Sequence, residues 1–431
     1  MLETKYSVIY FLTWDCNLAC QYCYEIGKSA RNMNWEVARD GVDFFMSKYK
    51  RVNFQFFGGE PLLQFNLMEK MAEYLKRNYD ERFGLSLFTN GTLISDEVVD
   101  FFRENKVFVT LSIDGSKATQ DKNRRFKNNQ GTFEILEPIL QKLIASKVSL
   151  RIRMTVTPDN CDKLFDNIKF FVEKYALTDI QEEVDRFTYW NENQIDILIE
   201  QYDQIINYLL GFYKSDNSFR WKNYEKRIHP FVNQSWKVQR GRCGSTEGMC
   251  SMDVDGTLYP CQKFIVNQTL SIGNIYSGFN EVQRDIVRNY LLPNYLEQTR
   301  QCKSCEAVNY CFAGCIADNY LQDTNQLQDC DFRRLHQNMH KKFYDELIRN
   351  NIAPKRYDSS IYRNTKGDGN SLVAVYGCGS EGCGAEGSAP AGCGAEGCGA
   401  EYSVPEGCGA EGCGAEGSAP AGCGAEGCGA E

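Results

Sequence analysis

The sequence is poor in the features that mark several classes of protein. It has only three histidines in 431 residues, too few for metal centres built on imidazole. No stretch of about 20 apolar residues occurs, and the opening residues MLETKYSVIYFLTW lack the basic region and apolar core of a signal peptide. Lysine and arginine do not outnumber the acids, so no basic surface argues for nucleic acid. We therefore expect a cytoplasmic protein that binds neither nucleic acid nor a membrane.

The net charge of −9 belongs to one end of the chain. Residues 377–431 contain nine of the 57 acidic residues, all of them glutamate, and no aspartate, lysine or arginine. Subtracting nine from 57 leaves 48 acids against 48 bases in the first 376 residues, which are therefore neutral. The chain thus divides by composition into a neutral body and an acidic tail.

The first 215 residues or so alternate short runs of β-branched and aromatic residues with longer amphipathic segments. This alternation is typical of repeated strand and helix units. It predicts an α/β fold, a partial (β/α)6 TIM-like barrel whose functional residues lie at the C-terminal ends of the strands. Strands are expected at 7–14, 52–58, 85–90, 107–114, 148–156 and near 179–183, and helices include 34–48 and 132–145.

The remainder of the chain has a different character. A helix is expected at 191–213, a cysteine-rich region runs from 243 to 330, and a last helix is expected at 333–349. A small domain built around metal has this composition. The predicted divisions are a barrel at 1–225, a cysteine-rich domain at 226–345, a linker at 346–376 and a tail at 377–431.

The tail consists of eleven pentads. Eight read GCGAE or GCGSE, and three are spacers, GSAPA, YSVPE and GSAPA. Half of the 36 glycines lie here, and no aliphatic side chain is larger than Val404. Such repeats have no apolar face to bury, so the cost of ordering them is not offset and we expect a disordered tail.

Three cysteines directly follow the first expected strand. Cys16, Cys20 and Cys23 form CxxxCxxC in WDCNLACQYCYE. Three thiolates on one loop can hold three irons of a [4Fe-4S] cluster and leave the fourth iron open to a ligand. On spacing alone, a zinc site that lacks one ligand is the alternative.

Two further segments close strands of the same sheet. FGGEP ends the second strand, where glycines allow the backbone to approach a ligand closely and Glu60 supplies an acceptor. SIDG ends the fourth, where Ser112 and Asp114 suit a ribose, and Arg124 twelve residues after Ser112 suits a carboxylate. At the ends of parallel strands, these segments predict one site with the cysteine loop.

Taken together, these motifs resemble the radical S-adenosylmethionine (SAM) enzymes. The resemblance implies that the open iron binds the amino and carboxylate groups of SAM, and that one-electron reduction yields a 5'-deoxyadenosyl radical that abstracts hydrogen from carbon. Family members often have His-Asp before the arginine, whereas this chain has Gln120-Asp121, which affects one local contact. The implied SAM contacts are Tyr22 for adenine, Gly58, Gly59 and Glu60 for the amino group, and Thr89, Asn90, Ser112, Asp114 and Arg124 for ribose and carboxylate.

The later cysteines match a seven-cysteine pattern, called SPASM, found behind the radical SAM domains of peptide-modifying enzymes. Cys250 adds an eighth thiol. Resemblance to anaerobic sulfatase-maturing enzymes implies two auxiliary [4Fe-4S] clusters, three clusters in all, with an electron donor such as flavodoxin or ferredoxin in an anaerobic or strongly reducing cytoplasm. A pair of zinc ribbons is the alternative. The implied ligands are Cys243, Cys250, Cys261 and Cys315 for one cluster and Cys302, Cys305, Cys311 and Cys330 for the other.

SPASM enzymes usually act on ribosomal peptides, and the tail offers such a peptide in cis. Each cysteine pentad places a glutamate three residues after its cysteine. We expect a thioether between the sulfur and a carbon of that glutamate, as in sactipeptides and ranthipeptides, with α-carbons of alanine or glycine as alternative acceptors. The tail, or a cysteine-rich precursor like it, is thus the expected substrate. The pairs are Cys378 and Glu381, Cys383 and Glu386, Cys393 and Glu396, Cys398 and Glu401, Cys408 and Glu411, Cys413 and Glu416, Cys423 and Glu426, and Cys428 and Glu431.

Other functions stay open at this point. Oxidation of Cys or Ser to formylglycine fits a C/S-x-A/P core, but the arginine expected after it is absent and Gln262 stands where sulfatase-maturing relatives carry an aspartate base. The tail can also be a metal-binding appendage, or enzyme and substrate were joined artificially. Outside these sites, His336 and His340 are expected on a solvated helix face, and Cys161 as a small buried residue.

Overall fold

The structure is a computed structural model. It describes residues 5–25, 27–215, 248–268, 270–291 and 326–352, with Phe231, Gly244, Ser245, Cys305, Cys315 and Ala317. The chain divides into two units, Met1–Ala385 and Glu386–Glu431, and the elements and the pocket described below lie in the first. The expected disordered tail and most of the expected linker lie outside the described residues.

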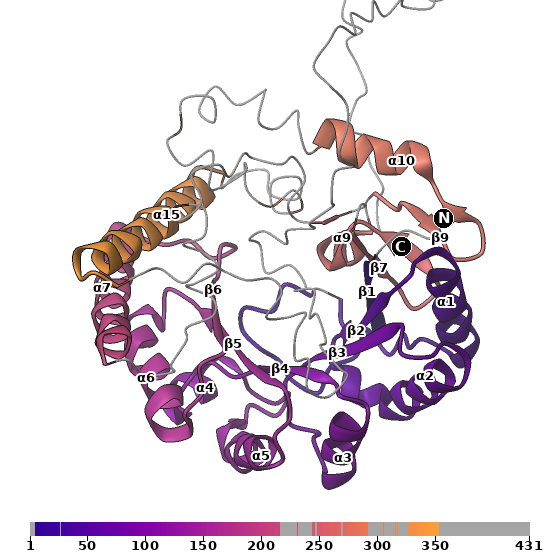
Figure 1. The fold of residues 1–431 in the computed structure, drawn as a ribbon, viewed down its shortest axis with the longest axis horizontal. Helices are drawn as coiled ribbons and strands as arrows, with labels where there is room; N and C mark the ends of the chain where they lie inside the picture. Colours follow the sequence, from indigo (N-terminus) through magenta and orange to yellow (C-terminus); the bar gives the residue numbers. More distant parts are fainter. Residues whose placement is uncertain are drawn as a thin grey trace, which may run out of the picture. The chain divides into compact units, whose positions relative to one another are not determined.

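Six parallel strands form the frame of the site. They neighbour one another in chain order and follow an arc (Figure 1). This confirms the α/β partial barrel, and each expected strand is present within about three residues of its predicted bounds. The strands are β1 (Tyr6–Thr13), β2 (Val52–Gly58), β3 (Phe83–Thr89), β4 (Phe108–Ser112), β5 (Leu150–Val156) and β6 (Ile180–Val184).

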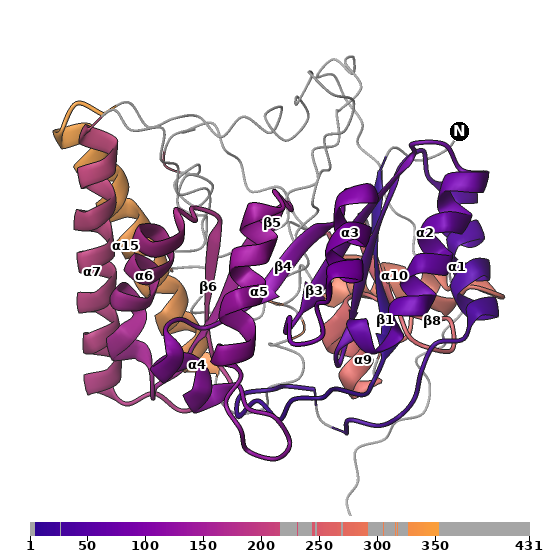
Figure 2. The same ribbon diagram turned by 90° about the horizontal axis from the view of Figure 1, so that it is seen from below.

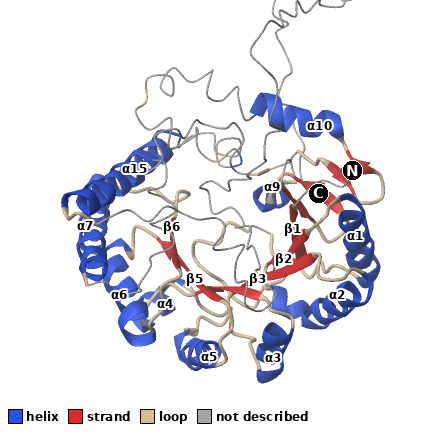
Figure 3. Cartoon of the chain, in the orientation of Figure 1, coloured by secondary structure: helices blue, strands red, loops and turns tan. Residues whose placement is uncertain are grey.

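Helices between the strands cover the outer side of this arc (Figure 3). Two of them begin at a capping residue: the side chain of Asn34 accepts from the backbone of Val37, and the side chain of Ser95 accepts from the backbone of Val98. The helices are α1 (Trp35–Lys48), α2 (Phe65–Asn78), α3 (Asp96–Glu104), α4 (Lys117–Asn123), α5 (Phe133–Ala145) and α6 (Leu164–Tyr175), with short 3-10 turns η1 (Pro61–Gln64) and η2 (Cys161–Lys163).

The sheet continues beyond the barrel. Strand β7 (Met249–Met252) pairs in parallel with the free edge of β1, and three short strands follow it antiparallel. The predicted division at residue 225 is therefore no break in the sheet, which has ten strands in the described residues. The added elements are β8 (Thr257–Tyr259), α9 (Gln262–Asn267), β9 (Gly273–Asn274), β10 (Gly278–Phe279), α10 (Glu281–Asp285) and a π-helical turn, η3 (Ile286–Leu291).

Two long helices, α7 (Glu192–Lys214) and α15 (Gln326–Arg349), lie side by side next to α6 (Figures 1 and 2). The expectation that His336 and His340 face solvent is wrong, because both are buried, at 3% and 0% exposed. His336 Nε2 lies 3.1 Å from the Tyr202 hydroxyl of α7. Packing of α15 on α7 is what removes this face from water. Cys161 is buried, as expected.

Among the described residues, no helix combines the length and apolar character needed to cross a bilayer.

Candidate functional site

A pocket lies where the C-terminal ends of the barrel strands meet. It contains every residue that the sequence assigned to SAM except Asp114, which contacts two of them from behind. The predicted residues that line it are Cys16, Cys20, Tyr22, Cys23, Gly58, Gly59, Glu60, Thr89, Asn90, Ser112 and Arg124.

The cysteine loop is held against the end of β2. Gly59 N donates to Thr13 O at 2.9 Å, and Glu60 N donates to Asp15 O at 2.8 Å. A Cβ atom at Gly58 or Gly59 would lie less than 3.0 Å from these same two carbonyl oxygens. The glycines therefore let one backbone pack on another and fix the segment that leads into Cys16.

Glu60 ties the end of β2 to the end of β3. Its carboxylate is 1% exposed and accepts three hydrogen bonds, from Thr89 Oγ1 at 2.7 Å, Asn90 N at 2.8 Å and Leu62 N at 3.1 Å. The side chain thus holds the pocket wall together from a position that also lines the pocket.

The burial of Glu60 predicts that the stability of the protein against unfolding depends on pH. Desolvation raises the pKa of the Glu60 carboxyl from 4.5 to about 7, against the three donors that lower it. Between about pH 4.5 and 7, the folded protein therefore keeps a proton on Glu60 that the unfolded chain releases. The contribution of Glu60 to the free energy of unfolding is thus complete below about pH 4.5 and is lost as pH rises through about 7. We expect wild type to lose about 3 kcal/mol relative to Glu60→Gln across this window. Parallel urea-unfolding midpoints for the two proteins from pH 4.5 to 8 would contradict this.

Asp114 organises the opposite wall. Its Oδ2 accepts from the Tyr22 hydroxyl at 2.5 Å, and its Oδ1 accepts from Thr155 N at 2.9 Å and lies 3.1 Å from Arg124 Nε. The Arg124 guanidinium also lies over the Tyr22 ring, 5.2 Å from its centroid. Asp114 is 1% exposed, so it positions these two side chains from behind the pocket.

Arg124 has unused hydrogen-bonding capacity that suits a ligand. It is 6% exposed, and its Nη2 has no hydrogen-bond partner among the described residues. A buried guanidinium nitrogen without an acceptor is costly. A carboxylate bound in the pocket would satisfy it.

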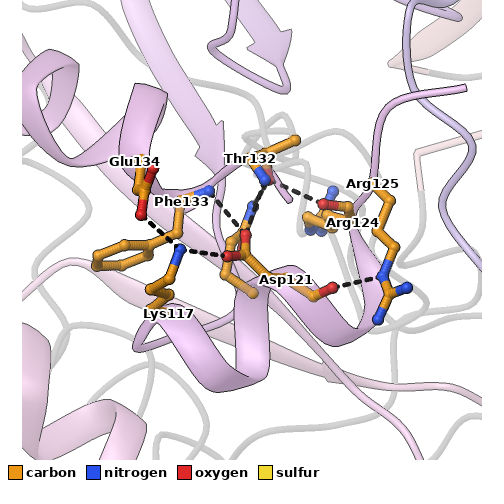
Figure 4. Close-up of polar contacts among 8 residues, drawn as sticks. Lys117, Asp121, Arg124, Arg125, Thr132, Phe133 and Glu134 are labelled. Atoms are coloured by element: carbon orange, nitrogen blue, oxygen red, sulfur yellow. Dashed lines mark hydrogen bonds and ion pairs between the residues drawn. The ribbon is translucent and has the colours of Figure 1, made fainter. Parts of the chain in front are cut away.

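The loop around Arg124 is held by polar contacts (Figure 4). Asp121 Oδ1 accepts from the backbone of Thr132 and Phe133 at the start of α5, and Thr132 Oγ1 donates to Arg124 O at 2.9 Å. Gln120, which stands where family members often have histidine, donates to Thr132 Oγ1 and accepts from Asp114 N. The glutamine therefore keeps a contact with the site.

The three thiols of the loop suit a cluster better than a single ion. Burial raises the pKa of Cys16 to about 12 and also raises those of Cys20 and Cys23, so a metal must displace their protons. In the described part of the chain, no three Cys, His, Asp or Glu side chains are placed to hold one metal ion. A [4Fe-4S] cluster takes each sulfur on a different iron, so it needs no such convergence on one point.

The predicted auxiliary ligands are described only in part. Cys243, Cys302 and Cys311 lie outside the described residues. Cys305 hydrogen-bonds to the Arg334 guanidinium, whose pKa it raises, and Cys330 also acts on Arg334. These two members of one predicted set thus share a neighbour.

Two members of the other predicted set, Cys250 and Cys261, lie on β7 and at the start of α9. Cys250 is fully buried on β7, and burial raises its pKa to about 12. Cys261 occupies the N-cap position of α9 without a side-chain capping hydrogen bond, and Cys315 is half-buried. Both cluster assignments remain predictions.

Several pocket residues were not identified from the sequence. They come from the cysteine loop and from β2, β5, β6 and α9. For Arg153 and Thr155 a signal was available in RIRMTV, where polar residues alternate with apolar ones along the strand. These residues are Tyr24, Glu25, Lys28, Gln55, Arg153, Thr155, Glu183, Asp185, Arg186 and Lys263.

A profile of the Radical SAM superfamily matches residues 10–172, the part of the chain that carries the cysteine loop and the first five strands. The chain carries a radical SAM domain. It is therefore an enzyme, and most residues that line the pocket at the strand ends fall within the matched segment.

Relatives extend the similarity past this domain. The chain is 31% identical over 174 residues to the uncharacterized protein MJ0907 of Methanocaldococcus jannaschii, covering 40% of this chain and 60% of that protein. It is 27% identical over 326 residues to the cysteine-type anaerobic sulfatase-maturating enzyme of Clostridium perfringens, covering 70% of this chain and 85% of that one. The structure of anSMEcpe with bound AdoMet and Cp18Cys peptide matches with a TM-score of 0.66 at 22% identity, over 81% of this chain and 98% of that chain, which shows a shared fold.

Proposed function

We propose that the protein is a radical SAM maturase that installs thioether crosslinks in a cysteine-rich peptide, with its own tail or a precursor like it as substrate. One observation carries the proposal. A radical SAM pocket and eight pentads, each with a glutamate three residues after a cysteine, occur in the same chain. The relatives named above support the broader class, because one is a maturating enzyme and one structure contains a peptide.

The residues at the strand ends suit both cofactors. Cys16, Cys20 and Cys23 would hold three irons of a [4Fe-4S] cluster. Arg124 would bind the carboxylate of SAM, and Tyr22 would contact its adenine. When bound and reduced by one electron, SAM supplies a radical that removes hydrogen from carbon. The surrounding protein orients the substrate and excludes water.

The chemistry of the crosslink fits a role for further clusters. Forming each thioether first removes one hydrogen atom from a carbon of the peptide. Joining the resulting carbon radical to the thiol then releases one proton and one electron. SAM cleavage accounts for the hydrogen atom, and an auxiliary cluster would accept the electron. Cys261, a predicted ligand, directly precedes Gln262 and Lys263, which line the pocket, and a flavodoxin or ferredoxin would supply the reducing electron.

Formylglycine formation is the second candidate, favoured by the similarity to sulfatase-maturating enzymes. It requires a base in the substrate pocket. Gln262, which stands where sulfatase-maturing relatives carry an aspartate base, lines the pocket and is 5% exposed, and its amide neither accepts nor releases a proton near neutral pH. We therefore rank thioether formation first.

The test is the mass of the tail after reaction. The full chain is reconstituted with iron and sulfide under argon and is given SAM and a reductant. It is then alkylated, and its intact mass is measured by mass spectrometry. We expect a loss of two hydrogens and of one alkylation site per crosslink, up to the eight cysteines of the tail. Loss of two hydrogens together with replacement of sulfur by oxygen at a cysteine would instead indicate formylglycine, and unchanged mass with tight metal uptake would indicate a chelator.

The tail contains its own control. Glu406 lies in the spacer YSVPE, which has no cysteine. Fragmentation should find Glu406 unmodified while glutamates such as Glu411 carry the crosslink. Modification of Glu406 at the rate of the others would contradict the pairing of each cysteine with the glutamate that follows it.

A further inference from the structure

The side of the pocket formed by β5, β6 and α9 carries three basic side chains that the proposed SAM contacts do not use. Arg153 lies on β5, Arg186 is the second residue after β6, and Lys263 lies on α9. Cationic side chains in a pocket attract anionic ligands. The question is what anion this wall would bind.

Arg153 differs from the arginine that precedes it on the same face of β5. Arg151 is buried and paired with Asp179, with Arg151 Nε 2.8 Å from Asp179 Oδ1. The Arg153 side chain makes no hydrogen bond or ion pair in the part of the chain that the structure describes, and it reaches the pocket partly exposed. A guanidinium in this position offers a planar pair of donors to a carboxylate.

The acidic side chains of this wall have other partners. Asp185 accepts from Phe187 N at 2.9 Å and from Thr188 Oγ1 at 2.6 Å. Glu183 accepts from Gln181 Nε2 at 2.8 Å. Neither carboxylate is paired with Arg153, so the positive charge of Arg153 is available to a ligand.

An aromatic pair lies beside these cations. The rings of Tyr24 and Phe187 stack with centroids 6.4 Å apart, and Lys263 Nζ lies 5.4 Å from the centroid of Phe187. Arg153 acts electrostatically on Tyr24. Phe187 is 49% exposed. The wall therefore combines an accessible apolar surface with positive charge, which suits a short acidic peptide.

We infer that Arg153 binds the side-chain carboxylate of the glutamate in a pentad peptide, with Lys263 as a second positive charge nearby. This rests on the proposed function, which makes the pentad peptide the substrate. The charges are complementary, because the tail has nine glutamates and no lysine or arginine. The contact would fix the distance of the preceding cysteine from the site and so determine which residues react.

The test compares two labelled peptides, GCGAEGCGAE and GCGAQGCGAQ, that differ only in charge. Each is bound to the reconstituted full-length protein with SAM, and fluorescence anisotropy gives the two dissociation constants. The chain's own tail competes equally with both peptides, so their ratio is unaffected. We expect wild type to bind the glutamate peptide about 10- to 100-fold more tightly. Arg153→Gln should reduce this preference to less than about threefold, and Arg153→Lys should keep part of it.

Two controls separate this contact from other effects. Arg103→Gln removes the same charge from an exposed position on α3 outside the pocket, and it should keep the wild-type preference. SAM affinity should be unchanged in Arg153→Gln. The inference is overturned if wild type shows no preference, if Arg153→Gln retains it, or if Arg153→Gln loses affinity for SAM.

The outcome is independent of the reaction that follows binding. The same samples are given a reductant, and the masses of the two peptides are measured by mass spectrometry. If the preference depends on Arg153 but no thioether forms, the carboxylate site stands and the proposed reaction fails. If thioethers form on both peptides at equal rates and binding shows no preference, the reaction stands and the carboxylate site fails.

Discussion

Cys16→Ala should abolish SAM cleavage while leaving the barrel folded. Formation of 5'-deoxyadenosine is expected to fall by at least about 1,000-fold, because the cofactor carries the chemistry and the cluster needs all three thiolates of the loop. Iron content should fall by about four atoms per chain. The Cys16 side chain lines the pocket and its thiol accepts a backbone hydrogen bond from Leu18, so no element of the sheet depends on it. Iron analysis and chromatographic quantification of 5'-deoxyadenosine check both effects.

Cys161→Ala is the matched control. Cys161 is also buried, but it lies in η2 outside the pocket, with its sulfur 3.3 Å from Pro158 O. Its removal should cost about 1 kcal/mol of stability and leave iron and activity unchanged. Wild-type iron content and 5'-deoxyadenosine formation in Cys16→Ala would contradict the assignment of the loop to a cluster.

Gly59→Ala should displace the cysteine loop by a purely steric effect. The added Cβ would lie less than 3.0 Å from the carbonyl oxygen and carbon of Asp15, and backbone atoms cannot move aside as a flexible side chain can. The loop must shift together with Cys16, which follows Asp15 directly. We expect a loss of about 1–3 kcal/mol of stability and a fall in 5'-deoxyadenosine formation on the order of 100-fold.

Gly211→Ala tests whether any glycine substitution has this result. Gly211 lies in α7, where a Cβ would meet nothing within 4 Å. Alanine is a better helix former than glycine, so this variant should gain about 0.5–1 kcal/mol. Urea unfolding, iron content and reaction rate distinguish the two variants. Equal behaviour of Gly59→Ala and wild type would show that the loop does not depend on this close approach.

Hydrophobic periodicity was sufficient to predict the barrel. Strands such as VNFQFFG are runs of apolar and aromatic residues flanked by turn residues, and helix starts carry capping residues such as Asn34. The pairing of β7 with β1 could not be predicted in this way. Met249–Met252 is only four residues long, and pairing between distant segments leaves no periodic signal in either.

The same limit applies to the site. Motifs at strand ends identified the residues around the cysteine loop, because each is a short contiguous signal. The role of Asp114 behind Arg124 and Tyr22 was not foreseen, since it depends on how three separate segments pack. Arg153 was missed because a single charged residue in a strand also occurs on solvated faces. The burial of His336 likewise depends on the packing of α15 against α7.

The pairing of β7 with β1 has a consequence for how the protein is made. Val8 lies opposite Cys250, so β1 leaves the ribosome more than two hundred residues before β7, which pairs with it. Until then one side of β1 is an unprotected edge that can pair with another chain. Completion of the cysteine-rich region therefore closes this edge, and a chain terminated before Met249 would be prone to aggregate even with all six barrel strands present.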